Sequence, residues 1–233
     1  MKCSCQELTT TSKNIFKQCF RDLWLFDDLL EAEQKLIDTI CVCKQFIPGQ
    51  TVFMQGDPAN TMFLIKAGRI KLSKVLKDGT EVTLDFRKAG DILGENALSG
   101  EEDYPVSAWT MENTIICGFS RNCFEQLIMQ HPRIGVRIIQ NMSKRMESLT
   151  SRLSNMATGS LEDRLYRTLM IVAREHSRQN PKGLAIQFPL THEELSFLVG
   201  AHRVSITKAM KTLVGSGKII KEGRTLILPR GVL

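Results

Sequence analysis

The stretch THEELSFLVGAHRVSITKAMKTLVGS, from Thr191 to Ser216, decides the fold of the C-terminal part of the chain. Thr191, followed three residues later by Glu194, forms a capping box that satisfies the free amides in the first turn of a helix. Gly200 can adopt the positive φ needed where a helix ends, so the chain can turn sharply and start a second helix. The pattern predicts a helix-turn-helix, which is typical of proteins that read DNA.

Apolar spacing predicts which faces of these two helices are buried. The first helix has the inward stripe Leu195, Leu198 and Val199, and the second has Ile206, Met210, Leu213 and Val214. The residues expected to point outward near the start of the second helix, where groove contacts are made, are His202, Arg203, Ser205, Thr207 and Lys208. An ordinary helical hairpin with a solvated basic face is the alternative for this pattern alone.

Two β-prone runs follow the second helix, at residues 217–220 and 225–228, around a glycine turn. They predict a small basic wing, so the whole segment is expected to be a winged helix. Lys221 and Arg224 are the wing residues expected to contact phosphates beside the groove.

The positive charge of the chain lies in its last third. Residues 158–233 hold 12 Lys and Arg against 6 Asp and Glu, a net +6, whereas residues 1–157 hold 19 of each kind. Basic residues gathered on one domain are expected where phosphates must be neutralised. A basic domain could instead bind an anionic membrane, but no lysine-rich run or amphipathic Trp/Phe helix accompanies it. Double-stranded DNA is therefore the expected partner.

Length and composition set the remaining bounds. With 233 residues and 42% hydrophobic content, the chain can bury a core and form one to two domains. The sequence has no apolar run near the ~18 residues that a membrane span needs, and no signal peptide, so we expect a cytoplasmic protein. Seven cysteines, an odd number, indicate a reducing compartment and argue against a disulfide scaffold. Neither a catalytic constellation nor a GxxxxGK[ST] loop is present, which argues against an enzyme.

The first half of the chain changes character near residue 46. Residues 1 to about 45 are expected to be helical, with the apolar residues Leu23, Trp24, Phe26, Leu29, Leu30, Leu36 and Ile40. Glycine turns then separate short β-prone runs at 51–54, 62–65, 69–76, 82–86, 107–111 and 114–119. Asp78-Gly79 between two of these runs is a strong hairpin signal. These features favour a β-barrel or sandwich.

From Pro132 to Ala157 the apolar period becomes helical. A heptad seam is formed by Ile139, Met142, Met146, Leu149, Leu153 and Met156. This helix could pack on its own β-domain, but a parallel coiled-coil dimer is favoured. A DNA-binding dimer with two-fold symmetry matches two DNA half-sites. Residues 158–160 then predict a hinge, with Ser160 capping a helix over 161–176 that carries Asp163 at its third position. The expected buried stripe of that helix is Leu165, Leu169 and Val172.

With this order of elements, the chain resembles the family of the cAMP receptor protein and the fumarate and nitrate reduction regulator. The motifs that carry the resemblance are Pro48-Gly49-Gln50, Gly56-Asp57, Gly68-Arg69-Ile70-Lys71, Gly90-Asp91-Ile92-Leu93-Gly94-Glu95, Ser107-Ala108-Trp109, the long helix and the Gly200 helix-turn-helix. The resemblance implies an α+β chain: N-terminal helices and a jelly-roll β-roll sensor over 1–131, a dimerisation helix over 132–157 and a winged helix-turn-helix over 158–233. It also implies a homodimeric transcription regulator that contacts RNA polymerase.

The resemblance points to a sensing pocket but argues against cAMP. In cAMP-binding members an arginine before a serine or threonine pairs with the cyclic phosphate, whereas here Val106 stands before Ser107. A buried phosphate would then lack its charge partner. Candidates to line a pocket for another small molecule are Gly94, Glu95, Asn96, Ser107, Arg137, Asn141 and Lys144. Solvated residues and a structural turn at Gly94 are the alternative.

Cysteines offer a second signal. Oxygen-sensing members hold a 4Fe-4S cluster, and Cys117 matches their ligand late in the β-roll, with Cys3, Cys5 and Cys19 able to supply the rest. The N-terminal spacing departs from the usual pattern. Thiol–disulfide sensing is a further alternative, and the remaining cysteines read equally as buried small hydrophobes: Cys41, Cys43 and Cys123. Haem also stays open, although no histidine falls within the expected β-roll strands.

The reading helix departs from the family pattern as well. Many members carry a glutamate at the position of Val204 and an arginine at that of Lys208, a pair that reads C and G edges. Val204 cannot accept from cytosine but can pack on a thymine methyl, as in halorespiration regulators, which the segment 200–208 resembles. We therefore expect an AT-leaning palindrome. Arg203 and Lys208 could instead contact only phosphates. A cyclic-nucleotide-binding module without DNA activity would explain the β-roll but not the basic winged helix.

Overall fold

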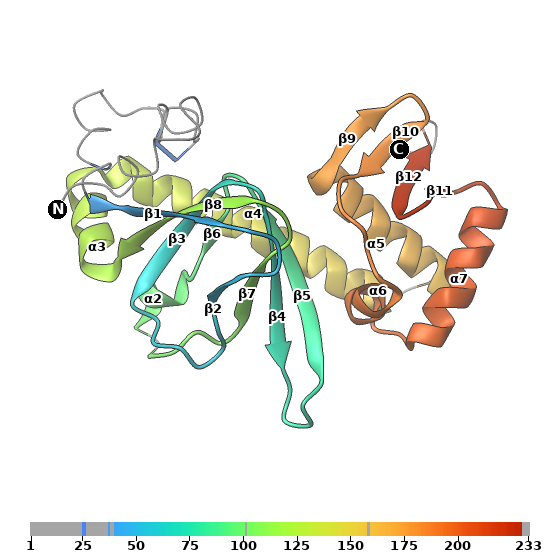
Figure 1. The fold of residues 1–233 in the computed structure, drawn as a ribbon, viewed down its shortest axis with the longest axis horizontal. Helices are drawn as coiled ribbons and strands as arrows, with labels where there is room; N and C mark the ends of the chain where they lie inside the picture. The colour runs from blue at the N-terminus through green and yellow to red at the C-terminus, as the bar shows by residue number, and fades with distance from the viewer. Residues whose placement is uncertain (1–24, 27–36, 38–39, 101, 158, 230–233) are drawn as a thin grey trace. The chain divides into compact units, whose positions relative to one another are not determined.

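A computed structural model describes residues 25–26, 37, 40–100, 102–157 and 159–229 of the chain. The chain folds into two compact units (Figure 1). One comprises the residues up to Glu81 and Asp85–Ser143; the other comprises Val82–Leu84 and Lys144–Leu233. Among the described residues, no helix is long and apolar enough to cross a membrane.

The first unit is built on antiparallel strands in two sheets. One sheet has the order β1-β8-β3-β6, formed by β1 (Val42–Phe46), β8 (Thr114–Ser120), β3 (Thr61–Ala67) and β6 (Ile92–Leu93). The other has the order β2-β7-β4-β5, formed by β2 (Thr51–Phe53), β7 (Ser107–Thr110), β4 (Arg69–Val75) and β5 (Glu81–Lys88). The six strands expected from the sequence are all present, to within a few residues at their ends, which confirms the β-rich fold of this unit.

The hairpin expected at Asp78-Gly79 is confirmed. It joins β4 to β5, which are neighbours in the sheet. The amide of Leu76 donates to the carbonyl of Thr80 at 2.9 Å, and the amide of Gly79 donates to the carbonyl of Leu76 at 3.0 Å. The Asp78 carboxylate accepts from the amide of Thr80 at 3.0 Å, and hydrogen bonding to the backbone and side chain of Thr80 lowers the pKa of Asp78. The turn is thus closed by its own polar groups.

The expected N-terminal helical region is wrong at its C-terminal end, because β1 occupies Val42–Phe46. Cys41 and Cys43 are buried while Val42 and Lys44 are exposed, which is the alternation of a strand at a sheet edge. Ile37 and Ile40 are helical, and Phe26 is fully buried. The other apolar residues named for this region lie outside the described residues: Leu23, Trp24, Leu29, Leu30 and Leu36. The short β6 was also not expected.

Helices follow the last strand of this unit. Ser120 caps α3 (Arg121–Gln130), its side chain accepting from the amide of Cys123, and α4 spans Pro132–Ala157. Ile134 and Ile138 on the first half of α4 pack in one core cluster with Phe119, Phe124 and Leu127. A second cluster lies between the two sheets and includes the stacked rings of Phe53 and Tyr104, whose centroids are 4.1 Å apart.

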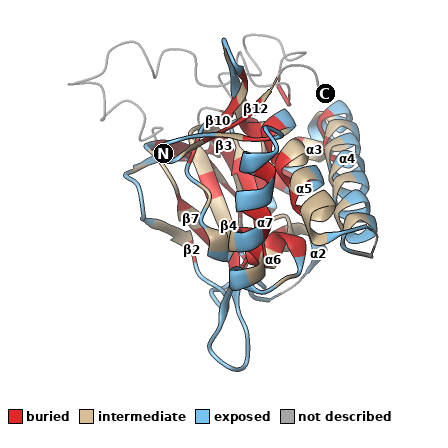
Figure 2. Ribbon diagram, turned by 90° about the vertical axis from the view of Figure 1, so that its right-hand side faces the viewer, coloured by how far each residue is buried: buried red, intermediate tan, exposed pale blue. Residues whose placement is uncertain are grey.

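The second unit contains α5 (Leu161–His176), α6 (His192–Val199) and α7 (Arg203–Gly215) beside a four-stranded sheet. The sheet order is β11-β12-β10-β9, formed by β11 (Ile220–Glu222), β12 (Thr225–Pro229), β10 (Gly183–Ile186) and β9 (Ser177–Asn180). The helix over 161–176 is confirmed, with Ser160 as its cap and Leu165, Leu169 and Val172 buried. The wing is confirmed as β11 and β12, but its first strand does not span the predicted residues 217–220: it begins at Ile220 and includes Lys221 and Glu222, which the sequence placed in the turn. The strands β9 and β10 were not expected from the sequence. Figure 2 shows the buried faces of the helices and the exposed length of α4.

Candidate functional site

The start of α6 is fixed by the capping box expected at Thr191. The Thr191 hydroxyl accepts from the amide of Glu194 at 3.1 Å, and the Glu194 carboxylate accepts from the amide of Thr191 at 2.8 Å. Both amides would otherwise be unsatisfied at a helix end. The cap therefore sets where α6 begins and holds the first helix of the motif in register.

The turn between α6 and α7 depends on Gly200. Its φ is 67°, in the left-handed region that side chains with a Cβ disfavour. The amide of Ala201 donates to the carbonyl of Ser196 at 2.9 Å, and the amide of Gly200 donates to that of Phe197 at 3.3 Å. These bonds satisfy the last carbonyls of α6 while the chain reverses. The helix-turn-helix is thereby confirmed, including its turn residue.

The inner face of α7 agrees with the helical spacing except at its last position. Ile206, Met210 and Leu213 are buried, together with Ala209, but Val214 is 36% exposed and the expectation that it faces the core is wrong. The residues at 206, 209, 210 and 213 already fill the buried arc. Val214 lies at the edge of this arc and at the end of the helix, where the chain leaves the core.

The outer face of α7 carries the expected reading residues to different degrees. His202, Arg203, Val204 and Lys208 are exposed, with Val204 at 67%. Ser205 and Thr207 are half-buried. Val204 is thus an exposed apolar side chain among basic neighbours at the first turn of α7. On the opposite face of α7, the buried side chain of Ile206 anchors the same turn in the core.

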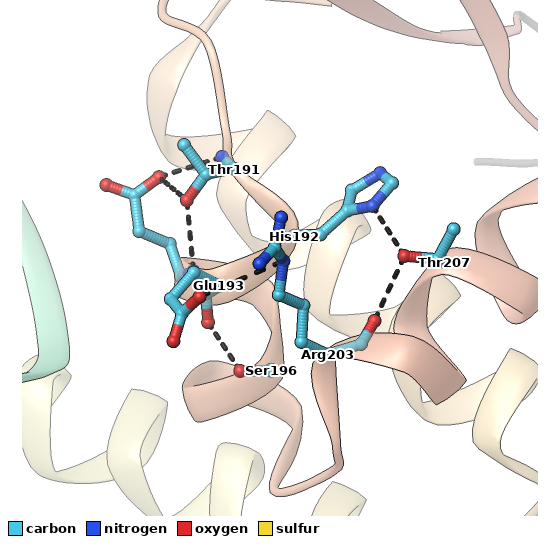
Figure 3. Close-up of polar contacts among 7 residues, drawn as sticks. Thr191, His192, Glu193, Ser196, Arg203 and Thr207 are labelled. Atoms are coloured by element: carbon cyan, nitrogen blue, oxygen red, sulfur yellow. Dashed lines mark hydrogen bonds and ion pairs between the residues drawn. The ribbon is translucent and has the colours of Figure 1, made fainter. Parts of the chain in front are cut away.

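Thr207 is held by a contact that the sequence did not suggest (Figure 3). Its hydroxyl donates to the carbonyl of Arg203 at 3.0 Å and lies 2.9 Å from Nδ1 of His192 at the start of α6. Because the hydroxyl gives its only proton to that carbonyl, Nδ1 of His192 is the donor in the second contact. Thr207 therefore links α7 to α6, which ties the reading helix to its neighbour.

Arg203 has an acidic neighbour. Its Nε lies 3.8 Å from Oε2 of Glu193, and both side chains are largely exposed, at 70% and 59% (Figure 3). Exposed ion pairs of this kind contribute little to stability. The contact nevertheless draws the guanidinium toward α6, so an anionic partner of Arg203 would have to compete with Glu193.

His192 lies among the cations of this surface. Burial, together with the charges of Lys221 and Arg203, lowers the pKa of His192 below its usual value. At neutral pH, the side chain of His192 between the wing and α7 is therefore the neutral imidazole.

The wing, the two helices and the loop before α6 line an open pocket of about 420 Å³. It is lined by Pro189, Leu190, Thr191, His192, Met210, Lys221, Gly223, Arg224 and Leu226. Lys221 and Arg224, the expected phosphate contacts, are exposed at its rim, on either side of the Gly223 turn. The basic residues of the wing and of α7 thus face solvent within one unit, as an electrostatic contact with phosphates requires.

In the β-roll unit, several candidate effector residues have structural partners. A Cβ at Gly94, whose φ is 69°, would come within 2.8 Å of the Thr61 carbonyl oxygen, so a structural turn accounts for this glycine. The Ser107 hydroxyl is buried and accepts from the amide of Gln55 at 2.9 Å. Asn96 begins the short helix α2 (Asn96–Ser99) and is half-buried. On α4, Arg137 and Asn141 are half-buried and Lys144 is exposed.

A buried guanidinium beside Glu95 was not expected. Arg87 on β5 is 8% exposed, with its Nε 3.1 Å from Oδ2 of Asp85 and its Nη2 3.7 Å from Oε1 of Glu95. The β-roll therefore contains a buried arginine although Val106 replaces the one in the family motif. Two carboxylates already face it, so its charge is compensated before an anionic ligand could bind. Arg87 could have been noticed only as a charged residue in a strand of alternating pattern.

The cysteines form a cluster other than the one named from the sequence. Cys117 on β8 is disulfide-bonded to Cys43 on β1, and Cys41 lies beside Cys43. Cys41 and Cys43 are indeed buried, and Cys123 is half-buried. Cys3, Cys5 and Cys19 lie outside the described residues. The cysteine count argued against a disulfide framework, and it missed this pairing because strand register, not spacing along the chain, brings residues 43 and 117 together.

The apolar seam of α4 is exposed throughout. All its members have at least a third of their side-chain surface accessible: Ile139, Met142, Met146, Leu149, Leu153 and Met156. In contrast, Ile134 and Ile138 near the start of α4 are buried in the core of the β-roll unit. An apolar face of this length that the described residues of its own chain leave exposed is typical of an interaction surface.

Comparisons with known proteins agree with this architecture. The cyclic nucleotide-binding domain model matches residues 43–131, and the Crp-like helix-turn-helix domain model matches residues 163–233. A CRP-like cAMP-activated global transcriptional regulator of Mycobacterium tuberculosis is 25% identical over 78% of this chain and 82% of its own. The cAMP-activated global transcriptional regulator CRP of Salmonella typhimurium is 27% identical over 81% of this chain and 90% of its own.

Solved structures share the fold. The c-di-GMP responsive global regulator CLP of Xanthomonas campestris aligns with a TM-score of 0.72 at 24% identity, over 84% of this chain and 97% of its own. A CRP-family transcriptional regulator from Thermus thermophilus aligns with a TM-score of 0.68 at 25% identity, over 80% and 92%. These matching domains and relatives are regulators of transcription and not enzymes.

Proposed function

Because the chain belongs to the CRP/FNR family of DNA-binding transcription regulators, we propose that it acts in the cytoplasm as a homodimer on a palindromic, AT-rich operator. Its β-roll senses a signal other than cAMP and repositions the winged helices. The observation that carries the proposal is the outer face of α7, where Arg203, Val204 and Lys208 are exposed on a helix whose opposite face is anchored in the core.

Each reading residue has a role that follows from its position. Arg203 and Lys208 supply cations to the groove, and Val204 packs on a thymine methyl group. His202 and Ser205 lie at the first turn of α7, where groove contacts are made, while Thr207 orients the helix through His192. Lys221 and Arg224 of the wing contact phosphates on the flank of the groove.

The dimer forms through the exposed seam of α4. The partner that covers this seam is a second copy of this chain, because the apolar side chains of a heptad seam are best buried against the same seam of a parallel helix. A two-fold protein also matches a palindrome, whose half-sites lie about one DNA turn, ~34 Å, apart. RNA polymerase is a further partner by similarity to the family.

The signal is a small molecule or a redox change. Val106 in place of the phosphate-binding arginine, and two carboxylates already facing Arg87, support a ligand other than cAMP. A 4Fe-4S cluster through Cys117 fits less well, since the cysteines beside Cys117 among the described residues are Cys41 and Cys43, which do not belong to the predicted ligand set. Haem has little support among the described residues, whose histidines all lie outside the β-roll strands.

Salt-dependent DNA binding tests the proposal. Fluorescence anisotropy with an AT-rich palindrome selected from a random pool should give an affinity that falls steeply as salt rises. The logarithm of the association constant should fall against the logarithm of the salt concentration with a slope of about −0.9 per phosphate neutralised. Binding that does not respond to salt, or the absence of any selected sequence, would contradict a sequence-specific regulator.

A substitution tests how α7 reads its site. Val204→Glu should shift selection toward a G·C pair at one position of each half-site, because a carboxylate accepts from the cytosine amino group. Val204→Ala is the matched control and should keep the AT preference with weaker binding. Unchanged selection by Val204→Glu would contradict the assignment of Val204 to the groove.

A further inference from the structure

Three cysteine sulfurs converge between β1 and β8. The two strands are antiparallel, with Cys43 directly opposite Cys117, and a disulfide joins these residues although 74 positions separate them in sequence. Cys41 precedes Cys43 by two residues, and Val42 between them is exposed, so both cysteines point to the same side. The sheet register therefore gathers three sulfurs at one point inside the first unit.

The sulfurs are close together and shielded from solvent. The Sγ atoms of Cys41 and Cys43 are 3.9 Å apart, and all three Sγ atoms lie within 4.8 Å of one another. Cys41 and Cys43 are each 2% exposed, and Cys117 is fully buried in the cluster that contains Phe119 and Phe124. The three sulfurs therefore form one compact group in the interior of the first unit.

We propose that these three residues form a site for a thiophilic divalent cation with a filled d shell, of which Zn²⁺ is the reference, and that the disulfide is the closed form of this site. A dithiol reductant opens the site by passing two electrons and two protons to the Cys43–Cys117 bond and becoming a disulfide itself. The cation then binds three thiolates and releases their three protons. Metal and disulfide exclude each other because they use the same sulfurs.

The geometry fits this chemistry. Zn–S bonds of about 2.3 Å in a tetrahedron place sulfurs about 3.8 Å apart, which is close to the separation of Cys41 and Cys43. The Cys43 and Cys117 sulfurs must separate from each other once their bond is reduced. Three protein ligands leave the fourth position of the ion to an exogenous donor. Three thiolates without a cation would be a costly buried charge, so the metal makes the deprotonated form tenable.

The site lies next to the elements that leave the sheet. Phe119, two residues after Cys117, packs against Phe124 of α3 with ring centroids 5.6 Å apart, and α3 continues into α4. Opening of the β1–β8 link therefore occurs beside the start of the long helix. The inference goes beyond the proposed function, because metal binding by this unit does not require that the winged helix bind DNA.

The test uses Co²⁺ as a spectroscopic probe on the full chain, kept without oxygen and reduced with a phosphine. We expect sulfur-to-cobalt charge-transfer bands and intense tetrahedral d–d bands that saturate near one ion per chain and disappear when Zn²⁺ is added. Cys41→Ser, Cys43→Ser and Cys117→Ser should each weaken binding at least about tenfold, since even residues behind a metal ligand have effects of that size. Cys123→Ser, a half-buried cysteine in α3, is the matched control and should bind as the parent does.

Oxidation supplies the second arm. Treatment with diamide should abolish Co²⁺ binding, and mass spectrometry of the unreduced digest should link Cys43 to Cys117. Binding by the oxidised chain, no binding by the reduced chain with native circular dichroism, or full binding by the cluster variants would overturn the proposal. So would loss of binding on replacing Cys3, Cys5 and Cys19 with serine if the cluster variants still bind. None of these outcomes depends on DNA binding, so the proposed function is tested separately.

Discussion

The reading helix α7 and the strand pair β1–β8 differ in how far apart their deciding residues lie in sequence. In α7, the buried and exposed faces are set by residues three and four positions apart, such as Ile206 and Met210. In β1–β8, the contact that defines the pair joins Cys43 to Cys117. Helical spacing can be read from one segment, whereas the partner of a strand is set by the whole sheet. The winged helix could therefore be predicted in detail from the sequence, whereas the cysteine cluster could not.

The disulfide should have the largest effect on stability in this comparison. Reduction with a phosphine, with metal removed by a chelator, should lower the free energy of unfolding of the β-roll unit by about 4 kcal/mol, because a long loop is no longer closed in the unfolded chain. Urea unfolding followed by tryptophan fluorescence reports this unit, since the chain's two tryptophans are Trp24 and Trp109. The Cys43→Ser/Cys117→Ser chain should not respond to the reductant. Equal midpoints for the oxidised and reduced parent would show that the link contributes nothing.

Within α7, the inner and outer faces should respond differently to truncation. Ile206→Ala removes a fully buried side chain and should cost about 3 kcal/mol, whereas Val204→Ala, which is exposed, should change stability by less than about 0.5 kcal/mol. Urea unfolding followed by far-ultraviolet ellipticity measures both. Similar costs for the two variants would mean that the helix faces are assigned wrongly.

The contact between Glu193 and Arg203 should have a smaller effect, and on DNA binding. Glu193→Gln removes a competitor for the guanidinium and should tighten binding by up to about fivefold, the scale of an exposed ion pair. Anisotropy titrations at low salt measure the change. Glu162→Gln, the same charge change in α5, is the control and should have less effect. Weaker binding by Glu193→Gln would mean that Glu193 orients Arg203 for DNA and does not compete for it.

The smallest effect is expected from protonation of His192. Because its pKa is lowered in the folded chain, the unfolded chain takes up a proton first as the pH falls. Its contribution to stability is complete above the usual histidine pKa of about 6.5 and is lost as the pH falls from there toward the lowered value. Unfolding measured between pH 7 and 5 should therefore show a shallower decline for His192→Gln than for the parent. Parallel declines would exclude a role for this histidine.

Most of the winged helix could be predicted because the sequence signals for its caps, its turn and its buried faces are local. The cap at Thr191, the turn at Gly200 and the stripe Leu165, Leu169 and Val172 each need only a few neighbouring residues. Val214 was placed wrongly because periodicity does not report where the packed surface ends. The strands β9 and β10 escaped detection because neither shows a clear alternation: two residues of β9 are exposed and three of β10 are buried.

The candidate sites divide in the same way. The basic residues of α7 and the wing could be named from helical spacing and a glycine turn, whereas the contact of His192 with Thr207 joins two helices at an angle that no spacing gives. Ser107 and Gly94 were named for a ligand, yet the Ser107 hydroxyl accepts from Gln55, and a side chain at Gly94 would clash with Thr61, which other strands and turns bring near. Arg87 could not be assigned a place beside Glu95 until the strand order was known.

Four properties follow from the linear order of residues: the order of the β-rich, long-helix and winged-helix segments, the family to which the chain belongs, the concentration of positive charge in its last third and most of the two faces of the reading helix. They depend on composition and on apolar periods of two to four residues, which can be read directly from a sequence. The folded chain was needed to show that Cys41, Cys43 and Cys117 meet, that Arg87 faces Asp85 and Glu95, and that Thr207 is tied to His192. Such contacts are fixed by strand register and helix packing, because both result from burying the whole core at once.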